Sequence, residues 1–152
     1  MAANKIYDSV PDATLVGSII LAYFLDRILP VATLVAFPAS LIGWAVVAVG
    51  VGFGAYILAV LKSKRTSTDA TGVPSEFITV GPYKFSRNPF YLSYVVIALG
   101  AAFAMGSLMA FLAPIICFSV LNWSVIPLEE KTLQKNFGHQ YTRYKQSVRR
   151  WI

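Results

Sequence analysis

The sequence predicts an all-α integral membrane protein with four transmembrane helices, arranged as two hairpins and followed by short amphipathic helices. Of its 152 residues, 57% are hydrophobic and only 13% are charged, whereas soluble domains average about 25% charged residues. The charges are also clustered, and they leave apolar runs of about the 20 residues that a helix needs to cross a bilayer. These observations predict a single membrane domain over residues 1–152.

The first hairpin is expected in the N-terminal half. A polar interfacial segment, Met1–Asp12, precedes a first span from Ala13 to about Leu29, and a second span runs from about Ala39 to Leu61. In the second span, Gly50 and Gly54 have the G-x-x-x-G spacing that lets helix backbones approach closely. Packing within the monomer is the default interpretation of this spacing, and a dimer contact is the alternative.

The second hairpin is expected because the apolar run from Phe90 to Trp123 is too long for one crossing. A helix over this run would be roughly 50 Å long at 1.5 Å per residue. Small residues offer a turn near Met105–Ser107, which gives a third span from about Phe90 to Ala104 and a fourth from Leu108 to Ile126. Four spans place both termini on the same side of the membrane.

Basic residues flank the apolar spans, so the net charge of +6 indicates orientation in the membrane rather than binding to nucleic acid. Lys62, Lys64 and Arg65 follow the second span, and the positive-inside rule places this end and both termini in the cytoplasm. The tail carries further basic residues, namely Lys131, Lys135, Arg143, Lys145, Arg149 and Arg150.

The single cysteine, Cys117, excludes a disulfide within the chain, and together with the single histidine, His139, it argues against a thiolate or histidine metal site. No metal is therefore expected. The tail Pro127–Ile152 is amphipathic, with a helix stop at Gly138 and a second short helix over Gln140–Val148.

The connection after the second span is expected to be irregular. Ser63–Pro74 is rich in Ser, Thr, Asp and Gly and predicts a loop, and Glu76–Val80 predicts a short extended or interfacial piece.

Polar chemistry gathers in the loop Gly81–Tyr91, which lies between long apolar runs. Pro82 and Pro89 fix φ and remove two backbone donors, and Pro89 suits the first position of the helix that follows. Arg87 is therefore held just ahead of a helix. We expect it to meet the acidic pair Glu129–Glu130, because the hairpin between them returns the chain to the side it left.

The series G-P-Y-K-F-S-R-N-P-F-Y, then a hairpin, then P-L-E-E-K-T-L-Q-K-N-F-G-H-Q-Y-T-R-Y, resembles the isoprenylcysteine carboxyl methyltransferase family and the wider set of phospholipid methyltransferase-like membrane enzymes. The resemblance covers Gly81–Ile152, and the N-terminal half matches only in being two apolar spans. It implies a methyltransferase that uses S-adenosylmethionine, held on the cytoplasmic side by the loop, the cytoplasmic ends of the hairpin and the tail. It also implies a lipid-like acceptor that enters from the bilayer.

One residue departs from the family pattern. The family loop usually reads Arg-His-Pro, and here it reads Arg87-Asn88-Pro89. Asparagine donates and accepts hydrogen bonds, but it cannot carry a proton near neutral pH as histidine can. A binding role for Asn88 is therefore expected, and an acid–base role is not.

The resemblance and the residue chemistry together select the candidate site residues. Arg87 can bind a carboxylate through two hydrogen bonds, either that of the cofactor or that of an acidic acceptor. Glu129 and Glu130 are predicted jointly to accept hydrogen bonds from the cofactor's ammonium group or ribose. The other cofactor-binding candidates are aromatic or polar residues of the loop, the fourth span and the tail: Tyr83, Asn88, Pro89, Tyr91, Asn122, Phe137, Tyr141 and Tyr144.

Each candidate also has a structural explanation. In this interpretation the acidic pair stabilises a helix dipole by about 0.3–1 kcal/mol, and Arg87 is only a positive-inside anchor. The tyrosines would form an interfacial belt, and Asn122 would bond a neighbouring helix. The combination of these residues, rather than any one of them, favours a functional site.

Methyl transfer from a sulfonium is an in-line displacement, so the protein must align donor and acceptor. A carboxylate acceptor needs no general base, which favours O-methylation of a prenylcysteine-type carboxylate over transfer to nitrogen or sulfur. The expected partner is thus a membrane lipid or a prenylated small molecule. The alternatives are a nicotinamide-dependent enzyme resembling membrane sterol reductases and a non-catalytic membrane scaffold.

Overall fold

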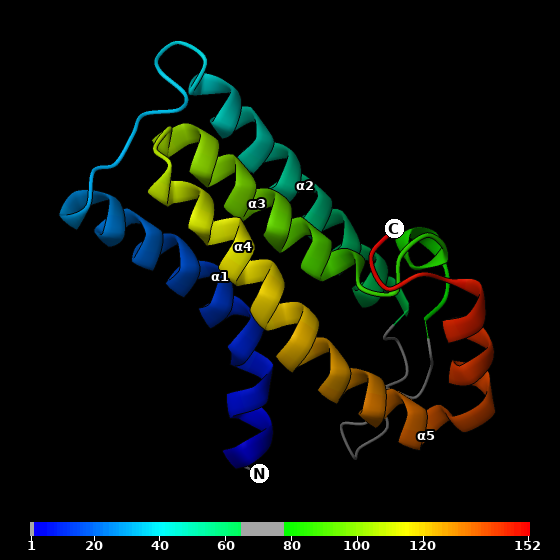
Figure 1. The fold of residues 1–152 in the computed structure, drawn as a ribbon. Coiled ribbons are helices and arrows are strands. Elements are labelled where there is room, and N and C mark those ends of the chain that lie inside the picture. The colour runs from blue at the N-terminus through cyan, green and yellow to red at the C-terminus, as the bar shows by residue number, and fades with distance from the viewer. Residues whose placement is uncertain (1, 65–77) are drawn as a thin grey trace.

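The computed structural model describes residues 2–64 and 78–152, and in these two ranges the chain is helical with no strand (Figure 1). The elements are α1 (Ala2–Ile28), α2 (Leu41–Lys64), the 3-10 turn η1 (Gly81–Lys84), α3 (Pro89–Met105), the 3-10 turn η2 (Met109–Phe111), α4 (Leu112–Val120), the π-helical turn η3 (Leu121–Val125) and α5 (Ile126–Ser147). The predicted all-α class is confirmed.

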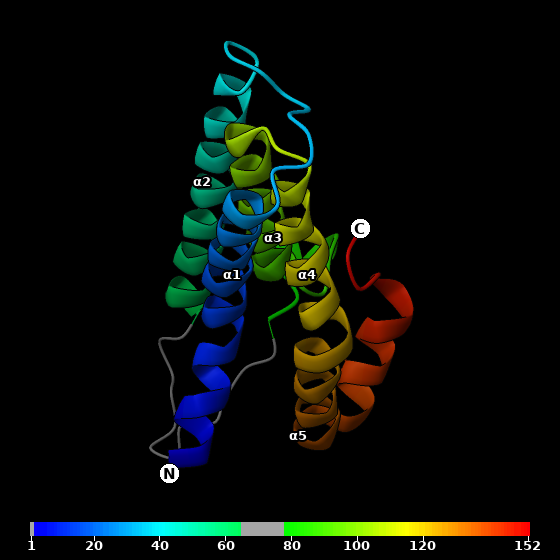
Figure 2. The same cartoon turned by 60° about the vertical axis from the view of Figure 1, so that its left-hand side comes forward.

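Three stretches of helix are long and apolar enough to cross a membrane, namely Ser9–Ile28, Leu41–Ser63 and part of Met109–Ser147. The fourth apolar helix, α3, has 17 residues, which is the lower limit for a span. It packs against α2 on one side and against α1 and α4 on the other, so it runs through the same bundle (Figures 1 and 2). The outer faces of α1 and α2 expose large apolar side chains such as Phe24 and Trp44, as expected for an integral membrane protein.

Glycines bring α2 and α3 together. A Cβ atom on Gly50 would lie 2.7 Å from Cγ1 of Ile97, and one on Gly54 would lie 3.0 Å from Oγ of Ser93. At Gly43 a Cβ atom would meet the backbone of α3 at 2.2 Å. The default interpretation of the G-x-x-x-G spacing, close packing within the monomer, is therefore confirmed.

The predicted turn between the third and fourth helices is present at Gly106, which ends α3 with a positive φ of 74°. Its carbonyl oxygen accepts the backbone N–H groups of Leu34 and Val35 at 2.7 and 3.0 Å. A Cβ atom here would lie 2.1 Å from the carbonyl oxygen of Val35. The α1–α2 connection is thus fixed to the turn of the second hairpin.

Two predicted boundaries are wrong. The polar segment Met1–Asp12 is not separate from the first span, since α1 runs unbroken from Ala2 through Pro11. The helix of the fourth span does not stop at Ile126, since it continues through η3 into α5. Pro127 is the second residue after this π-helical turn. A wider turn reduces the clash between a proline ring and the preceding turn.

The predicted helix stop at Gly138 is a bend. Gly138 has φ 48° and ψ −117°, which is not helical, and the chain resumes a helical path beyond it. The second arm of α5 therefore turns back toward the rest of the bundle, and the last residues reach the loop before α3 (Figure 1). From Arg65 onward, the predicted loop Ser63–Pro74 and the start of the predicted segment Glu76–Val80 lie outside the described residues.

Candidate active site

The loop before α3 is built by its own backbone. Gly81 has a positive φ of 61°, and the N–H groups of Phe85 and Ser86 both donate to the carbonyl oxygen of Pro82. The predicted role of Pro89 as the first residue of α3 is confirmed, with Asn88 as the residue before it. These constraints place Arg87 immediately ahead of α3.

The last residues of the chain close over this loop. The backbone N–H of Arg87 donates to the carbonyl oxygen of Arg149 at 2.9 Å. The next carbonyl oxygen, that of Arg150, accepts hydrogen bonds from Asn88 Nδ2 at 3.1 Å and from Ser86 Oγ at 3.3 Å. Loop and tail, about 60 residues apart in the sequence, therefore form one unit.

Glu130 is the centre of the site. Its Oε1 lies 2.9 Å from NH1 of Arg87, and its Oε2 lies 3.0 Å from NH2 of Arg150 and 3.3 Å from Nζ of Lys145. The side chains of Arg87 and Glu130 are each 9% exposed. The hairpin and the bend at Gly138 thus bring cations from the loop, the second arm of α5 and the tail onto one carboxylate.

The charges in this cluster do not balance. Glu130 lies beyond the apolar part of its helix. Burial raises its pKa, but the bond to Arg150 and the charges of Arg87, Arg150 and Lys145 outweigh burial and hold the pKa below its usual value. One carboxylate therefore faces three cations.

The guanidinium of Arg87 also has unused hydrogen-bonding capacity. Its Nε and NH1 are buried and find no hydrogen-bond acceptor among the described residues, although NH1 stands at ion-pair distance from Glu130. The distance and the missing hydrogen bond are compatible, because the carboxylate approaches from a direction poorly aligned with the N–H bonds. A second anion would match both this geometry and the excess positive charge.

The two acids of the pair have different surroundings. Glu129 is exposed and its Oε1 accepts a hydrogen bond of 2.6 Å from the hydroxyl of Tyr91 on α3, whereas Glu130 faces Arg87. Adjacent residues on a helix point about 100° apart, so only one of them can meet the loop. The sequence did not separate them, and the structure does.

Asn122 fixes the tail from the π-helical turn. Its Oδ1 accepts hydrogen bonds from Nε1 of Trp151 at 3.0 Å and from NH1 of Arg150 at 3.3 Å. Sequence reasoning assigned Arg150 and Lys145 only to membrane orientation and gave Trp151 no role in the site. The available signal was that a second cluster of cations follows the acidic pair in the same tail.

The structure places the aromatic candidates in different parts of the site. Tyr141 and Tyr144 are buried with ring centroids 6.4 Å apart, and burial raises the pKa of both. The Tyr144 hydroxyl donates to the carbonyl oxygen of Tyr83 at 2.6 Å. Phe137 is half-buried beside the bend at Gly138. The structure therefore gathers Tyr141 and Tyr144 at the loop–tail junction and places Tyr91 on α3 beside Glu129.

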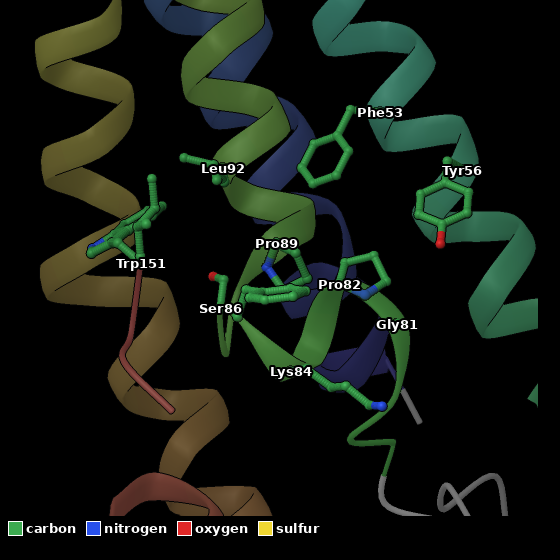
Figure 3. Close-up of a pocket in the computed structure, with 11 residues that line it drawn as sticks. Phe53, Tyr56, Gly81, Pro82, Lys84, Ser86, Pro89, Leu92 and Trp151 are labelled. Atoms are coloured by element: carbon green, nitrogen blue, oxygen red, sulfur yellow. The ribbon is translucent and has the colours of Figure 1, made fainter. Parts of the chain in front are cut away.

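Two hollows flank the cluster. A polar cleft of about 460 Å³ lies between the two arms of α5 and is lined by Pro127, Glu130, Lys131, Gln134, Lys135 and Lys145. Gln134 holds the two arms of α5 together, since its Nε2 donates a hydrogen bond to Oγ1 of Thr142 at 3.0 Å across the bend. The second hollow is an apolar groove of about 630 Å³ lined by residues of α2, the loop, the start of α3 and the end of the chain (Figure 3).

A helical membrane bundle with a buried arginine–glutamate cluster where loop and tail meet has the arrangement that the sequence resemblance led us to expect of a membrane methyltransferase. Comparison with known families agrees. Residues 39–140 match the family described as phospholipid methyltransferase, which is more than half of the chain, and the protein belongs to this family.

The matched region extends from the start of α2 into the second arm of α5. A curated relative, an uncharacterized protein from Haemophilus influenzae, is 44% identical over 62 residues, which cover 41% of this chain and 98% of the relative. No solved structure matches the chain.

Proposed function

We propose that this membrane methyltransferase takes its methyl group from S-adenosylmethionine and transfers it to a carboxylate oxygen of a lipid-like acceptor of the prenylcysteine type. The observation that carries the proposal is the buried Arg87 guanidinium, whose Nε and NH1 lack a hydrogen-bond acceptor among the described residues. Bidentate binding of a carboxylate fits such a group. Both the cofactor and the proposed acceptor carry one.

The transfer needs alignment more than acid–base chemistry. When bound, the cofactor supplies an electrophilic methyl group: its C–S bond breaks as the new C–O bond forms, the sulfonium becomes a thioether and the carboxylate becomes a methyl ester. No proton is released. This balance suits a loop in which the family's usual histidine is replaced by Asn88.

The protein's own residues take distinct roles in this proposal. Arg87 binds a carboxylate, and Glu130 positions the guanidinium groups of Arg87 and Arg150, since its oxygens already face three cations. Glu129, which is exposed, accepts hydrogen bonds from the cofactor's ammonium group or ribose. The remaining residues assigned to cofactor binding are Tyr83, Asn88, Pro89, Tyr91, Asn122, Phe137, Tyr141 and Tyr144.

A cytoplasmic orientation is part of the same proposal. The end of α2 with Lys62, the loop with Arg87 and the basic tail lie at one end of the bundle (Figure 1). The positive-inside rule favours the cytoplasm for this end.

A second acceptor class deserves a parallel test, because the family is described by phospholipids. An aminophospholipid would have to lose a proton before its nitrogen attacks. Glu129, hydrogen-bonded to Tyr91 at the exposed edge of the site, is the carboxylate available for that step.

Binding measurements on the purified protein test the donor. Titration with S-adenosylmethionine, with its demethylated product and with NADPH should show binding of the first two and not of NADPH. Arg87→Gln should abolish binding, whereas Lys62→Gln, an exposed cation at the same end of the bundle, should not. Binding of NADPH alone would favour a reductase, and binding of none of the three would favour a scaffold.

The product identifies the acceptor. Incubation with lipid extract and a labelled methyl donor should give a labelled lipid that releases volatile methanol under mild base, because methyl esters hydrolyse and N-methyl groups do not. A base-stable product would replace the carboxylate acceptor by an amine.

A further inference from the structure

The apolar groove is separate from the arginine–glutamate cluster. It lies between α2, the loop before α3 and the last two residues, and Ser86 and Pro89 line it from the loop. Arg87, Asn122, Glu129 and Glu130 do not line it. Pro89 is the one residue assigned to cofactor binding that lines the groove, so an occupant reaches none of the charged groups assigned to methyl transfer.

The groove has an apolar end and a charged end. Phe53 on α2 and Leu92 on α3 mark one end, Trp151 and Tyr56 stand on opposite sides, and Lys84 marks the other end (Figure 3). Leu92 is one turn inside α3, whereas Lys84 is in the loop before it. The apolar end therefore lies deeper along the bundle than the charged end.

The side chains of the lining carry a single sign of charge. Lys84 is its only charged residue, and no acidic residue lines it. The rim includes Phe85 and Ile152, which are 78% and 75% exposed, and such large exposed apolar surfaces mark contact with a partner or a membrane. A ligand that matches the groove has an apolar chain and an anionic head.

We propose that this groove binds an anionic phospholipid, with an acyl chain against Phe53, Leu92 and Trp151 and the phosphate at Lys84. This lipid is a bound component rather than the methyl acceptor, because neither Arg87 nor the pair Glu129–Glu130 lines the groove. It also contacts Trp151, which Asn122 holds in place. The site does not depend on the reaction that the protein catalyses.

Fluorescence quenching of Trp151 tests the proposal. The chain has three tryptophans, so Trp44→Phe with Trp123→Phe leaves Trp151 alone. In nanodiscs of unlabelled phosphatidylcholine, a small fraction of brominated phosphatidylglycerol should quench Trp151 more strongly than the same fraction of brominated phosphatidylcholine. A matched protein that keeps only Trp123, which is 68% exposed, should be quenched equally by the two lipids.

Substitution of the charged end completes the test. The preference for the anionic lipid is the ratio of Trp151 quenching by the two brominated lipids, and Lys84→Gln should lower it about fivefold. Lys62 is a cation that does not line the groove, so Lys62→Gln should leave this ratio unchanged. Equal quenching of Trp151 by both lipids, or an unchanged preference in Lys84→Gln, would overturn the proposal. Absence of quenching by either lipid would show that the groove holds no lipid and would overturn it as well.

Discussion

Replacing Glu130 should destabilise the protein more than replacing any of its partners. In Glu130→Gln the guanidinium of Arg87 loses its counter-charge while its side chain is only 9% exposed. Removing one partner of a buried ion pair costs about 3–5 kcal/mol. Arg150 and Lys145, which are 30% and 48% exposed, can turn toward water, so we expect the lower end, about 3 kcal/mol.

The single cysteine provides the assay. Cys117 is fully buried in α4, so a thiol-reactive fluorescent dye reports unfolding as detergent-solubilised protein is heated. A loss of about 3 kcal/mol should lower the midpoint by about 6–12 °C for a chain of this length. Lys145→Met removes one half-exposed partner and should lower the midpoint by less than about 2 °C.

Two further variants separate an unpaired buried charge from a general loss of packing. Arg87→Met should cost less than Glu130→Gln, because the carboxylate keeps Arg150 and Lys145. The double variant Arg87→Met with Glu130→Gln should recover much of the loss, since no buried charge is then unpaired. Additive losses in the double variant, or an Arg87→Met variant as unstable as Glu130→Gln, would refute the reasoning.

Acid should reproduce the effect of Glu130→Gln. The folded state holds the pKa of Glu130 below its usual value, so the unfolded state takes up a proton first as pH falls. The contribution of this carboxylate is thus complete above about pH 5 and is lost as pH falls below the unfolded pKa toward the lower folded value. The midpoint difference between the wild type and Glu130→Gln should therefore be constant from pH 8 to about pH 5 and shrink below that; a difference that already shrinks near neutral pH would contradict the assigned direction.

Two more predictions follow, one from the helix packing and one from the site. Gly43→Ala should strongly destabilise or misfold the protein, since its Cβ would lie 2.2 Å from the backbone nitrogen of Ala104. The control Gly52→Ala has open space around it and should be neutral or stabilising by up to about 1 kcal/mol. Equal unfolding midpoints for the two variants would contradict the close packing of α2 and α3. Tyr91→Phe removes the 2.6 Å hydrogen bond to Glu129 and should cost about 1 kcal/mol, measured by the same dye assay. A loss near that of Glu130→Gln would mean that Glu129 is the more important acid.

Much of the architecture could be predicted because hydrophobicity and length are local properties. The apolar runs and the glycine spacing of α2 led to an all-helical bundle, and a run too long for one crossing led to the turn at Gly106. The residues at which the helices begin and end were less predictable. A proline at position 127 normally marks a helix start, but here a π-helical turn carries the helix past it.

The meeting of Arg87 with the acidic pair followed from topology alone, because a hairpin returns the chain to the side it left. Which acid meets the arginine did not, since neighbours on a helix differ by about 100° and the sequence does not fix the rotation of α5 about its axis. In the folded protein α5 is rotated so that Glu130 faces the loop.

The sequence by itself determined that this chain is a helical membrane protein whose polar chemistry gathers beside one loop, because burial in lipid constrains composition and span length. Only the tertiary structure decided that Lys145, Arg150 and Trp151 of the tail join the site. The bend at Gly138 and the bonds of Asn122 bring Lys145, Arg150 and Trp151 back onto the loop. Contacts of this kind depend on the direction in which the chain leaves a bend, and no periodicity in the sequence encodes that direction.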